Sequence, residues 1–402
     1  MSRNRRLSLI LAASWLAQPA TAAESIADAL KGSKVMIDWR VRFESVEQEE
    51  FAENAEALTS RLRAGFRTAE LKKTSLLAEV VWLEDAIDDY NSTTNGKTAY
   101  PVVPDPTGFV AINRFAFTNK SLANAALTIG RQRIVHDDAR FVGNVVWRQH
   151  EQTYDGVRAE LGGSSPLTAD LTYAYKVNRV LGPDSAAGKW DGDILLASVA
   201  RAFDWGRVSA FAYGLDLKDA PAQSSNTVGV KVTGSKPLGG VTGTYALSYA
   251  HQTDAGRNPA DFDADYRLVE GGVRAGKYSV ALGREVLGSA NGVGFSMPLA
   301  TLHAFQGWAD KFLATPAAGI KDDYLRVTYS LGQKGPLKSL NAVVAYRELR
   351  ADAGDADYGD ETDFSLVAQI ARLTFLLKYA TYSADGLFTD TDKLWLSMEY
   401  SF

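Results

Sequence analysis

The feature that most constrains this chain is a two-residue alternation of apolar and polar side chains that recurs from residue 33 to the C-terminus. Val35, Ile37 and Trp39 share one parity, whereas Asp38 and Arg40 share the other. Two residues is the repeat of a β-strand with one apolar and one polar face. The pattern predicts about 18 strands. They start near residues 33, 58, 74, 109, 122, 153, 167, 192, 207, 225, 240, 264, 277, 321, 339, 361, 373 and 392.

The lengths of the strands and of their links favour a membrane barrel. Each segment covers about ten to thirteen residues, which is what a tilted strand needs to cross a bilayer. The links alternate between short turns and long loops, as in outer-membrane barrels with short periplasmic turns. A soluble β-sandwich also alternates, but its strands average about five or six residues. We therefore predict an all-β fold, a single-chain transmembrane antiparallel up-and-down β-barrel formed by residues 23–402.

The first 22 residues have the features of a secretory signal peptide. Arg3, Arg5 and Arg6 precede an apolar run at residues 7–16, and Ala20-Thr21-Ala22 provides small residues for cleavage. A membrane anchor would need about 20 apolar residues. A cleaved signal peptide at residues 1–22 and a barrel place the mature chain in the cell outer membrane. The expected partners are outer-membrane lipid, lipopolysaccharide and the barrel-assembly machinery, since the terminal Phe402 resembles an outer-membrane assembly signal.

Composition argues against several functions. The chain has no cysteine, so thiol nucleophiles, disulfides and thiolate zinc sites are excluded. A net charge of -5 gives no basic field for nucleic acid. The four histidines show no metal-ligand spacing, and only His136, beside Asp137 and Asp138, suggests a weak hydrolytic alternative. We predict no catalytic residue, no metal and no cofactor, although aspartates at 261, 263 and 265 and at 352, 355 and 357 could bind calcium.

Two long stretches carry a family resemblance. They are LTIGRQRIVHDDARFVGNVVWRQHEQTYDGV at residues 127–157 and FSMPLATLHAFQGWADKFLATP at residues 295–316. Both resemble the alginate-export family of outer-membrane proteins, in particular its shorter porin-like members. The resemblance implies an eighteen-stranded barrel that passes hydrophilic solutes, with uronate polysaccharide as the founding substrate. The turn near Arg372 is too short for the late periplasmic loop that gates the dedicated exporter.

Basic side chains of the polar parity form the expected pore wall. A row of arginines early in the chain could clamp carboxylates with paired hydrogen bonds, although porin interiors also pair Arg with Asp or Glu for packing alone. Arg131 and Arg133 share the apolar parity of their segment, and we place them in the lumen or at its rim. The predicted pore-lining residues are Arg40, Arg42, Arg61, Arg63, Arg67, Arg131, Arg133, Arg148, Arg158, Arg274, Arg326, Arg347 and Lys378.

The loop at residues 288–320 is the longest and is unusually apolar. Because its side chains would be costly in water, we predict that it folds into the barrel mouth and narrows it. A self-packed cap on the rim is the alternative. The predicted constriction residues are Phe295, Leu302, His303, Phe305, Trp308, Asp310 and Lys311.

The sequence thus favours a non-enzymatic channel for passive passage of hydrophilic, anionic solutes such as uronates or oligosaccharides. A dedicated exopolysaccharide secretion port is the alternative, and a barrel-borne hydrolase or adhesin is a third. The solute, the direction of transport, the oligomeric state and any gating by the loop stay open at this stage.

Overall fold

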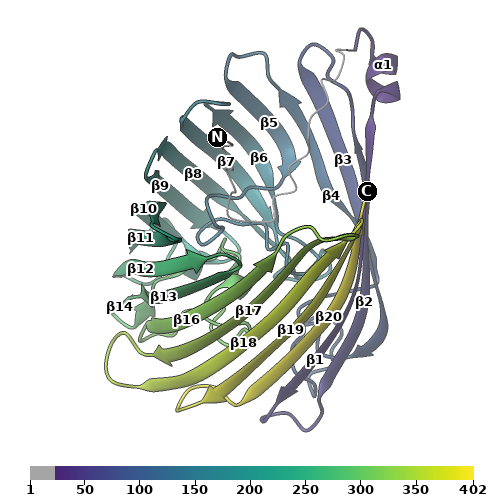
Figure 1. Ribbon diagram of the computed structural model, residues 1–402. Coiled ribbons are helices and arrows are strands. Elements are labelled where there is room, and N and C mark those ends of the chain that lie inside the picture. Colours follow the sequence, from purple (N-terminus) through teal and green to yellow (C-terminus); the bar gives the residue numbers. More distant parts are fainter. Residues whose placement is uncertain (1–22) are drawn as a thin grey trace.

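The computed structural model describes residues 23–402, so the signal-peptide prediction for residues 1–22 lies outside the described part. Eighteen strands form one sheet in which every strand pairs antiparallel with its neighbours in the chain. The first strand, β1, also pairs with the last, β20, through the register Val41↔Met398. The sheet therefore closes on itself (Figure 1). The predicted barrel and strand count are confirmed.

Every barrel strand begins within four residues of its predicted start. No helix in the described chain is long and apolar enough to cross a membrane. The strands are β1 Lys34–Gln48, β2 Ala55–Arg67, β3 Thr74–Asp89, β4 Phe109–Asn119, β5 Ala125–Gln132, β6 Thr153–Leu161, β7 Leu167–Asn178, β8 Lys189–Phe203, β9 Gly206–Leu217, β10 Ser225–Leu238, β11 Val241–Asp254, β12 Asp263–Ala275, β13 Tyr278–Leu287, β16 Ile320–Leu331, β17 Leu337–Arg350, β18 Asp357–Ile370, β19 Leu373–Ala384 and β20 Thr391–Ser401. The remaining elements are helices α1 Ile26–Lys31, η1 Pro221–Gln223 and η2 Leu302–Ala304, and the short pair β14 Ser289–Ala290 and β15 Val293–Gly294.

Burial separates the two faces of the strands. On β1, Val35, Ile37 and Trp39 are exposed on the outer face, whereas Arg40 and Arg42 are buried on the inner face. A closed barrel in a membrane presents its apolar face to lipid and its polar face to the lumen. The exposed apolar side chains on the outer wall are therefore the lipid-facing surface that the alternation predicts.

The turns at one end of the barrel are tight. Gly239 between β10 and β11 and Gly276 between β12 and β13 have φ angles of 65° and 57°. Two-residue hairpin turns need such left-handed backbone, which glycine adopts without strain. The start of β1 and the end of β20 also lie at this end of the barrel, beside each other. This arrangement matches the predicted periplasmic side.

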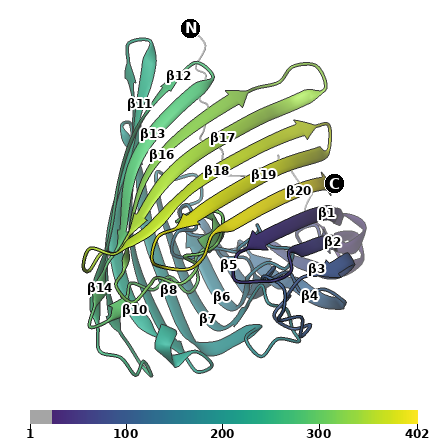
Figure 2. The same cartoon turned by 90° about the horizontal axis from the view of Figure 1, so that it is seen from below.

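Long connections from the other end fold inward and fill much of the barrel (Figure 2). Residues 133–152, between β5 and β6, are called here the first inner loop, and residues 288–319, between β13 and β16, the second inner loop. Both pack against apolar side chains on the inner faces of β9 and β12, including Phe211, Leu215 and Tyr266. A third connection packs Tyr90 and Val103 over the ends of β1 and β2. The interior is thus a packed core as well as a polar lumen.

Candidate functional site in the barrel lumen

The two inner loops are bonded to each other. The amide of Gly143 donates to the carbonyl of Leu299 at 2.8 Å, and the amide of Thr301 donates to the carbonyl of Ala139 at 2.9 Å. Their side chains also pair, because Arg148 Nη2 lies 2.6 Å from Asp310 Oδ2. The loops therefore form one unit that lies across the lumen.

Buried His303 links this unit to the wall. Lys378 Nζ on β19 lies 2.6 Å from His303 Nε2, and His303 Nδ1 lies 2.7 Å from Asp310. These contacts suit a neutral imidazole that accepts from the ammonium and donates to the carboxylate. Its ring also stacks on Trp147 of the first inner loop, with centroids 4.2 Å apart.

The electrostatics agree with this assignment. Burial, together with the nearby Lys378 ammonium, holds the pKa of His303 well below its ordinary value. Burial by itself raises the pKa of Asp310, but Arg148, Lys393 and the hydrogen bond with His303 outweigh it and leave that pKa well below normal. A neutral histidine and an ionised aspartate therefore join the second inner loop to the first.

The second inner loop is also anchored at its tip. Glu361 on β18 accepts hydrogen bonds from the amides of Trp308 and Ala309, the latter at 2.8 Å. The backbone reaches this carboxylate because Gly307 has a φ of 92° and carries no Cβ, which would collide with Glu361. Only glycine fits such an approach without strain.

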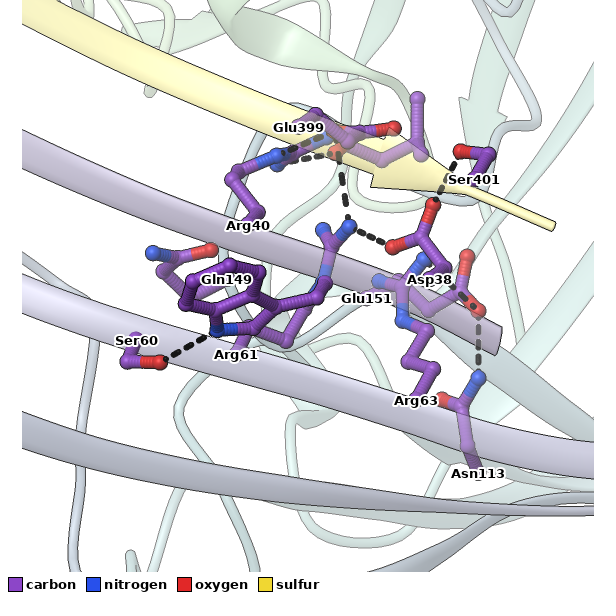
Figure 3. A network of polar contacts seen from close by, with 12 residues as sticks. Asp38, Arg40, Ser60, Arg61, Arg63, Asn113, Gln149, Glu151, Glu399 and Ser401 are labelled. Atoms are coloured by element: carbon purple, nitrogen blue, oxygen red, sulfur yellow. Dashed lines mark hydrogen bonds and ion pairs between the residues drawn. The ribbon is translucent and has the colours of Figure 1, made fainter. Parts of the chain in front are cut away.

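The arginine row that the sequence predicts on β1 and β2 is buried. The side chains of Arg40, Arg42, Arg61 and Arg63 are at most 10% exposed. Arg40 Nε lies 2.6 Å from Glu399 of β20, and its Nη1 donates to the carbonyls of Val146 and Trp147 in the first inner loop. Arg61 pairs with Asp38 and lies 3.5 Å from Glu399 (Figure 3).

This burial corrects the expectation of a basic ladder open to solutes. Asp38 and Glu399 are 27% and 26% exposed, so beside Arg40 and Arg61 the lumen meets carboxylates rather than guanidinium groups. Arg42 lies 4.2 Å from the Trp147 ring centroid and 3.8 Å from Asp105. Most of these arginines therefore hold the first inner loop in place. This is the alternative given above, in which the arginines serve packing and not solute binding.

Two partly exposed arginines, Arg114 and Arg133, occur nearby. They belong to a group that we call the Glu151 cluster: Arg63, Arg114, Arg133, Glu79 and Glu151. Arg133 Nη2 lies 2.5 Å from Glu151, and Arg114 Nη2 lies 2.7 Å from Glu79. Arg63 lies 3.7 Å from Glu151 (Figure 3). Burial alone raises the pKa of Glu151, but Arg63 and Arg133 outweigh it and keep the pKa well below normal.

The charge balance of the Glu151 cluster is positive. Three arginines surround two glutamates, and Asn113 donates to both carboxylates at 2.6 Å. The side chains of Arg133 and Arg114 are 32% and 14% exposed, whereas those of Glu79 and Glu151 are 5% and 0% exposed. A solute in the lumen therefore meets the cations of this cluster and not its acids.

The other predicted wall residues lie in several places. Arg131 shares the outer strand face with Leu127 and Ile129 and pairs with Asp155 at 2.7 Å, so the expected lumenal position is wrong. Arg67 and Arg274 are exposed near the short turns, without an ion pair to any residue in 23–402. The remaining four are paired or enclosed on the inner face: Arg158 with Asp170, Arg326 with Glu270, Arg347 with Asp322 and Lys378 with His303.

The predicted constriction residues all lie inside the barrel. Phe295 is fully buried against Tyr266, and Trp308 lies over Lys378. Lys311 donates to Thr391 at 2.9 Å, and burial lowers its pKa to about 8. Within this loop, Leu302–Ala304 form the single helical turn η2. The second inner loop is therefore not a self-packed cap on the rim, because its side chains contact the inner wall of the barrel.

A cavity of about 480 Å³ remains inside the barrel against β9–β13, β16 and β17. The tips of both inner loops border it. Its charged lining residues are Asp137, Asp138, Arg207, Lys231, Glu270, Glu285, Arg326 and Arg347.

The histidines are engaged in packing contacts. His136 lies 3.0 Å from the Tyr213 hydroxyl and 3.3 Å from Asp170, both buried. His251 lies within β11 and contacts Asp265 at 3.1 Å. No group of three or more potential metal-ligating side chains occurs in residues 23–402, including the two aspartate-rich loops.

Sequence reasoning missed Arg114, Glu151, Arg207 and Asp105 as lumenal groups. The signal for Arg114 is the adjacent polar pair Asn113-Arg114 between apolar neighbours, where β3 and β4 change register. Arg207 lies on the inner face of β9, where the inner residues Phe211, Tyr213, Leu215 and Leu217 are apolar, so the polarity of the residues assigns the two faces of this strand wrongly. Glu151 and Asp105 lie in loops, where side chains do not alternate between an inner and an outer face.

Comparison with known proteins places the fold. The chain is similar to the outer membrane protein OpdK of Pseudomonas aeruginosa, with a TM-score of 0.72 and 14% identity over 92% of this chain and 99% of that one. OccAB4 of Acinetobacter baumannii matches with a TM-score of 0.69 and 15% identity, over 96% and 100% of the two chains. OpdK in complex with vanillate matches with a TM-score of 0.69 and 13% identity, over 92% and 99%. No curated protein matches the sequence significantly.

The family is shown by the sequence itself. The family model described as alginate export matches residues 34–278, which is more than half of the chain. The matched region contains the first of the two stretches quoted above, and it covers the Glu151 cluster. Taken with the closed barrel, this match means that the chain belongs to the alginate export family and is an outer-membrane β-barrel channel of that type.

Proposed function

We propose that this channel passes small hydrophilic solutes by diffusion and prefers anions, such as uronates or short acidic oligosaccharides. The observation that carries the proposal is the Glu151 cluster, where three arginines outnumber two glutamates and two of the arginines, Arg114 and Arg133, are more exposed than either acid. In a narrow lumen with low-dielectric walls, one excess charge acts over the whole width of the path. Guanidinium groups at that point favour carboxylates through paired hydrogen bonds.

The inner loops support a small solute over a polymer. Their mutual hydrogen bonds and their anchors at Glu361 and Lys378 hold both loops inside the barrel. A polysaccharide secretion port would have to release both loops together. OpdK, which shares the fold, forms a complex with vanillate, a small carboxylate, and this supports the same size and charge for the solute here.

A transport role also suits the histidines better than catalysis does. His136 and His303 each have a carboxylate partner, but both rings are buried. Within residues 23–402, neither ring forms a hydrogen bond with a serine or threonine hydroxyl. A hydrolase would need such a nucleophile beside the base. The proposed surroundings are outer-membrane lipid and lipopolysaccharide, with insertion by the barrel-assembly machinery through the strand that ends at Phe402.

The test is solute entry into liposomes that contain the purified barrel. Glucuronate should enter faster than glucose, which has nearly the same size and no charge. Arg114→Gln with Arg133→Gln should remove this preference and leave glucose entry within about twofold, since only charge is changed. Arg201→Gln on the outer face of β8 is the matched control and should behave as wild type.

Heat-modifiable migration of each variant on a denaturing gel shows whether the barrel has folded. Faster entry of glucose than of glucuronate in the wild-type protein would contradict the proposal. An unchanged preference in the folded double variant would instead remove the Glu151 cluster as its cause.

A further inference from the structure

The cavity beside β9–β17 differs from the Glu151 cluster in its charge. Four acids and four bases line it: Asp137, Asp138, Glu270 and Glu285 against Arg207, Lys231, Arg326 and Arg347. The net formal charge of this lining is therefore zero. A simple anion gains no overall electrostatic attraction in this cavity, so we expect the cavity to bind a different kind of solute.

One flank of the cavity exposes both signs of charge close together. On β9, Arg207 is 46% exposed and lies 3.5 Å from Asp137, which is 21% exposed. On the neighbouring β10, Lys231 is 8% exposed and its partner Asp138 is 38% exposed. Arg207 pairs in register with Thr233, two residues from Lys231 on the same face. The exposed groups on this flank are thus one guanidinium and one carboxylate.

The acids on this flank are fixed by further contacts. Ser209 donates to Asp137 at 2.7 Å, and Lys231 donates to Asp138. Asp137 has a positive φ of 48°, so the loop turns sharply where the two aspartates meet the wall. The carboxylate of Asp138 is therefore held by Lys231, and it follows directly in the chain on Asp137, the partner of Arg207.

Next to this flank the lining is apolar. Ala246 of β11 and Leu268 of β12 lie on the wall, and Ala304 and Phe305 of the second inner loop lie opposite. The Phe305 ring is held by Arg140, whose guanidinium carbon lies 4.4 Å from its centroid. Arg326 and Tyr324 close the far side, both within hydrogen-bond distance of Glu270.

We propose that this cavity binds a zwitterionic solute of the α-amino-acid type with an apolar side chain. The carboxylate of the solute faces Arg207, its ammonium group faces Asp138, and its side chain lies between Leu268 and Phe305. Opposite charges on β9 and on the first inner loop suit a molecule whose two charged groups are bonded to the same carbon atom. The inference rests on the proposed channel function and adds a second solute class with its own site.

The test uses three probes that share one side chain: phenylalanine, N-acetyl-phenylalanine without the ammonium charge, and phenylalaninamide without the carboxylate. Calorimetric titration of the detergent-solubilised barrel should show phenylalanine binding about tenfold more tightly than either derivative, the effect of losing one charged hydrogen bond. Arg207→Gln should weaken phenylalanine by a similar factor and leave phenylalaninamide unchanged. Asp138→Asn should leave N-acetyl-phenylalanine unchanged, and Arg201→Gln should change none of the three.

The outcomes separate the two proposals. Tighter binding of N-acetyl-phenylalanine than of phenylalanine would make the cavity an anion site and overturn the inference. Equal binding of all three, or none, would also overturn it, while glucuronate entry into liposomes would still support the channel function. Preferential binding of phenylalanine to a barrel that passes no solute would support the site and reject the channel function.

Discussion

Replacing Glu151 by glutamine should free the first inner loop. Glu151 is fully buried and is contacted by Arg133 at 2.5 Å, Arg63 at 3.7 Å and Asn113 at 2.6 Å. Asn144 of the same loop donates to it at 3.1 Å. The variant removes the carboxylate that Arg63 and Arg133 share and leaves their charges facing a neutral amide. Removing one partner of a buried ion pair costs about 3–5 kcal/mol.

That cost predicts a measurable change in local opening. If this cost falls on the docking of the loop and not on the barrel, amide hydrogen exchange within residues 133–152 should accelerate by a factor of about 10² to 4 × 10³. Exchange in β8 to β13 should stay unchanged, because their ladder hydrogen bonds are not touched. Hydrogen exchange followed by mass spectrometry of the barrel in detergent resolves these segments.

A matched control sets the scale. Glu160→Gln on β6 removes a carboxylate that is 48% exposed and lies 3.1 Å from Arg158. An exposed pair of this kind is worth about 0–1 kcal/mol, so exchange should change less than fivefold. Equal exchange of residues 133–152 in the two variants would refute the idea that Glu151 holds the loop.

Two further predictions concern the inner loops. Burial and the Arg63 charge lower the pKa of His150 to about 4, and the pKa of His303 is also lowered, so both rings charge more readily once the loops are released. The docked loops should therefore weaken as pH falls from about 6.5 toward 4, by up to about 1.4 kcal/mol per pH unit for each histidine. Hydrogen exchange of the loops, corrected for its intrinsic pH dependence, should rise over this range, and slower exchange in acid would contradict the assignment. Gly307→Ala should loosen the second inner loop, because a Cβ would strike the Glu361 carboxylate. Its exchange at residues 300–312 should rise at least tenfold, whereas Gly335→Ala, in an open turn with positive φ, should leave that segment unchanged.

Much of the fold could be predicted from the sequence because strand parity is a local property. Each strand must expose one row of side chains to lipid and the other to the interior. The period of two and the strand starts can therefore be recognised within short segments of the sequence. β9 shows the limit of this reasoning: its inner residues Phe211, Tyr213 and Leu215 are apolar because the inner loops pack on them. The polarity of a strand's side chains therefore identifies its lumenal face only where no loop packs against the wall.

The site was harder to predict for the same reason. Parity correctly indicates that Arg40 and Arg61 point inward, but it cannot show that a loop from more than 80 residues away covers them. It also cannot place Glu151 or Asp138, which reach the wall through loops. The apolar character of residues 288–320 did predict an enclosed position, since so many large apolar side chains would be costly in water.

The most direct test of the account is the conductance of single channels in planar bilayers with and without the second inner loop. Leu287 and Ile320 are register partners, so a four-residue turn of glycine and serine can replace residues 288–319 and still join β13 to β16. The account predicts a folded barrel whose conductance is several times that of the full chain. A folded barrel with unchanged conductance would contradict the claim that loops inside the lumen set the width of this channel.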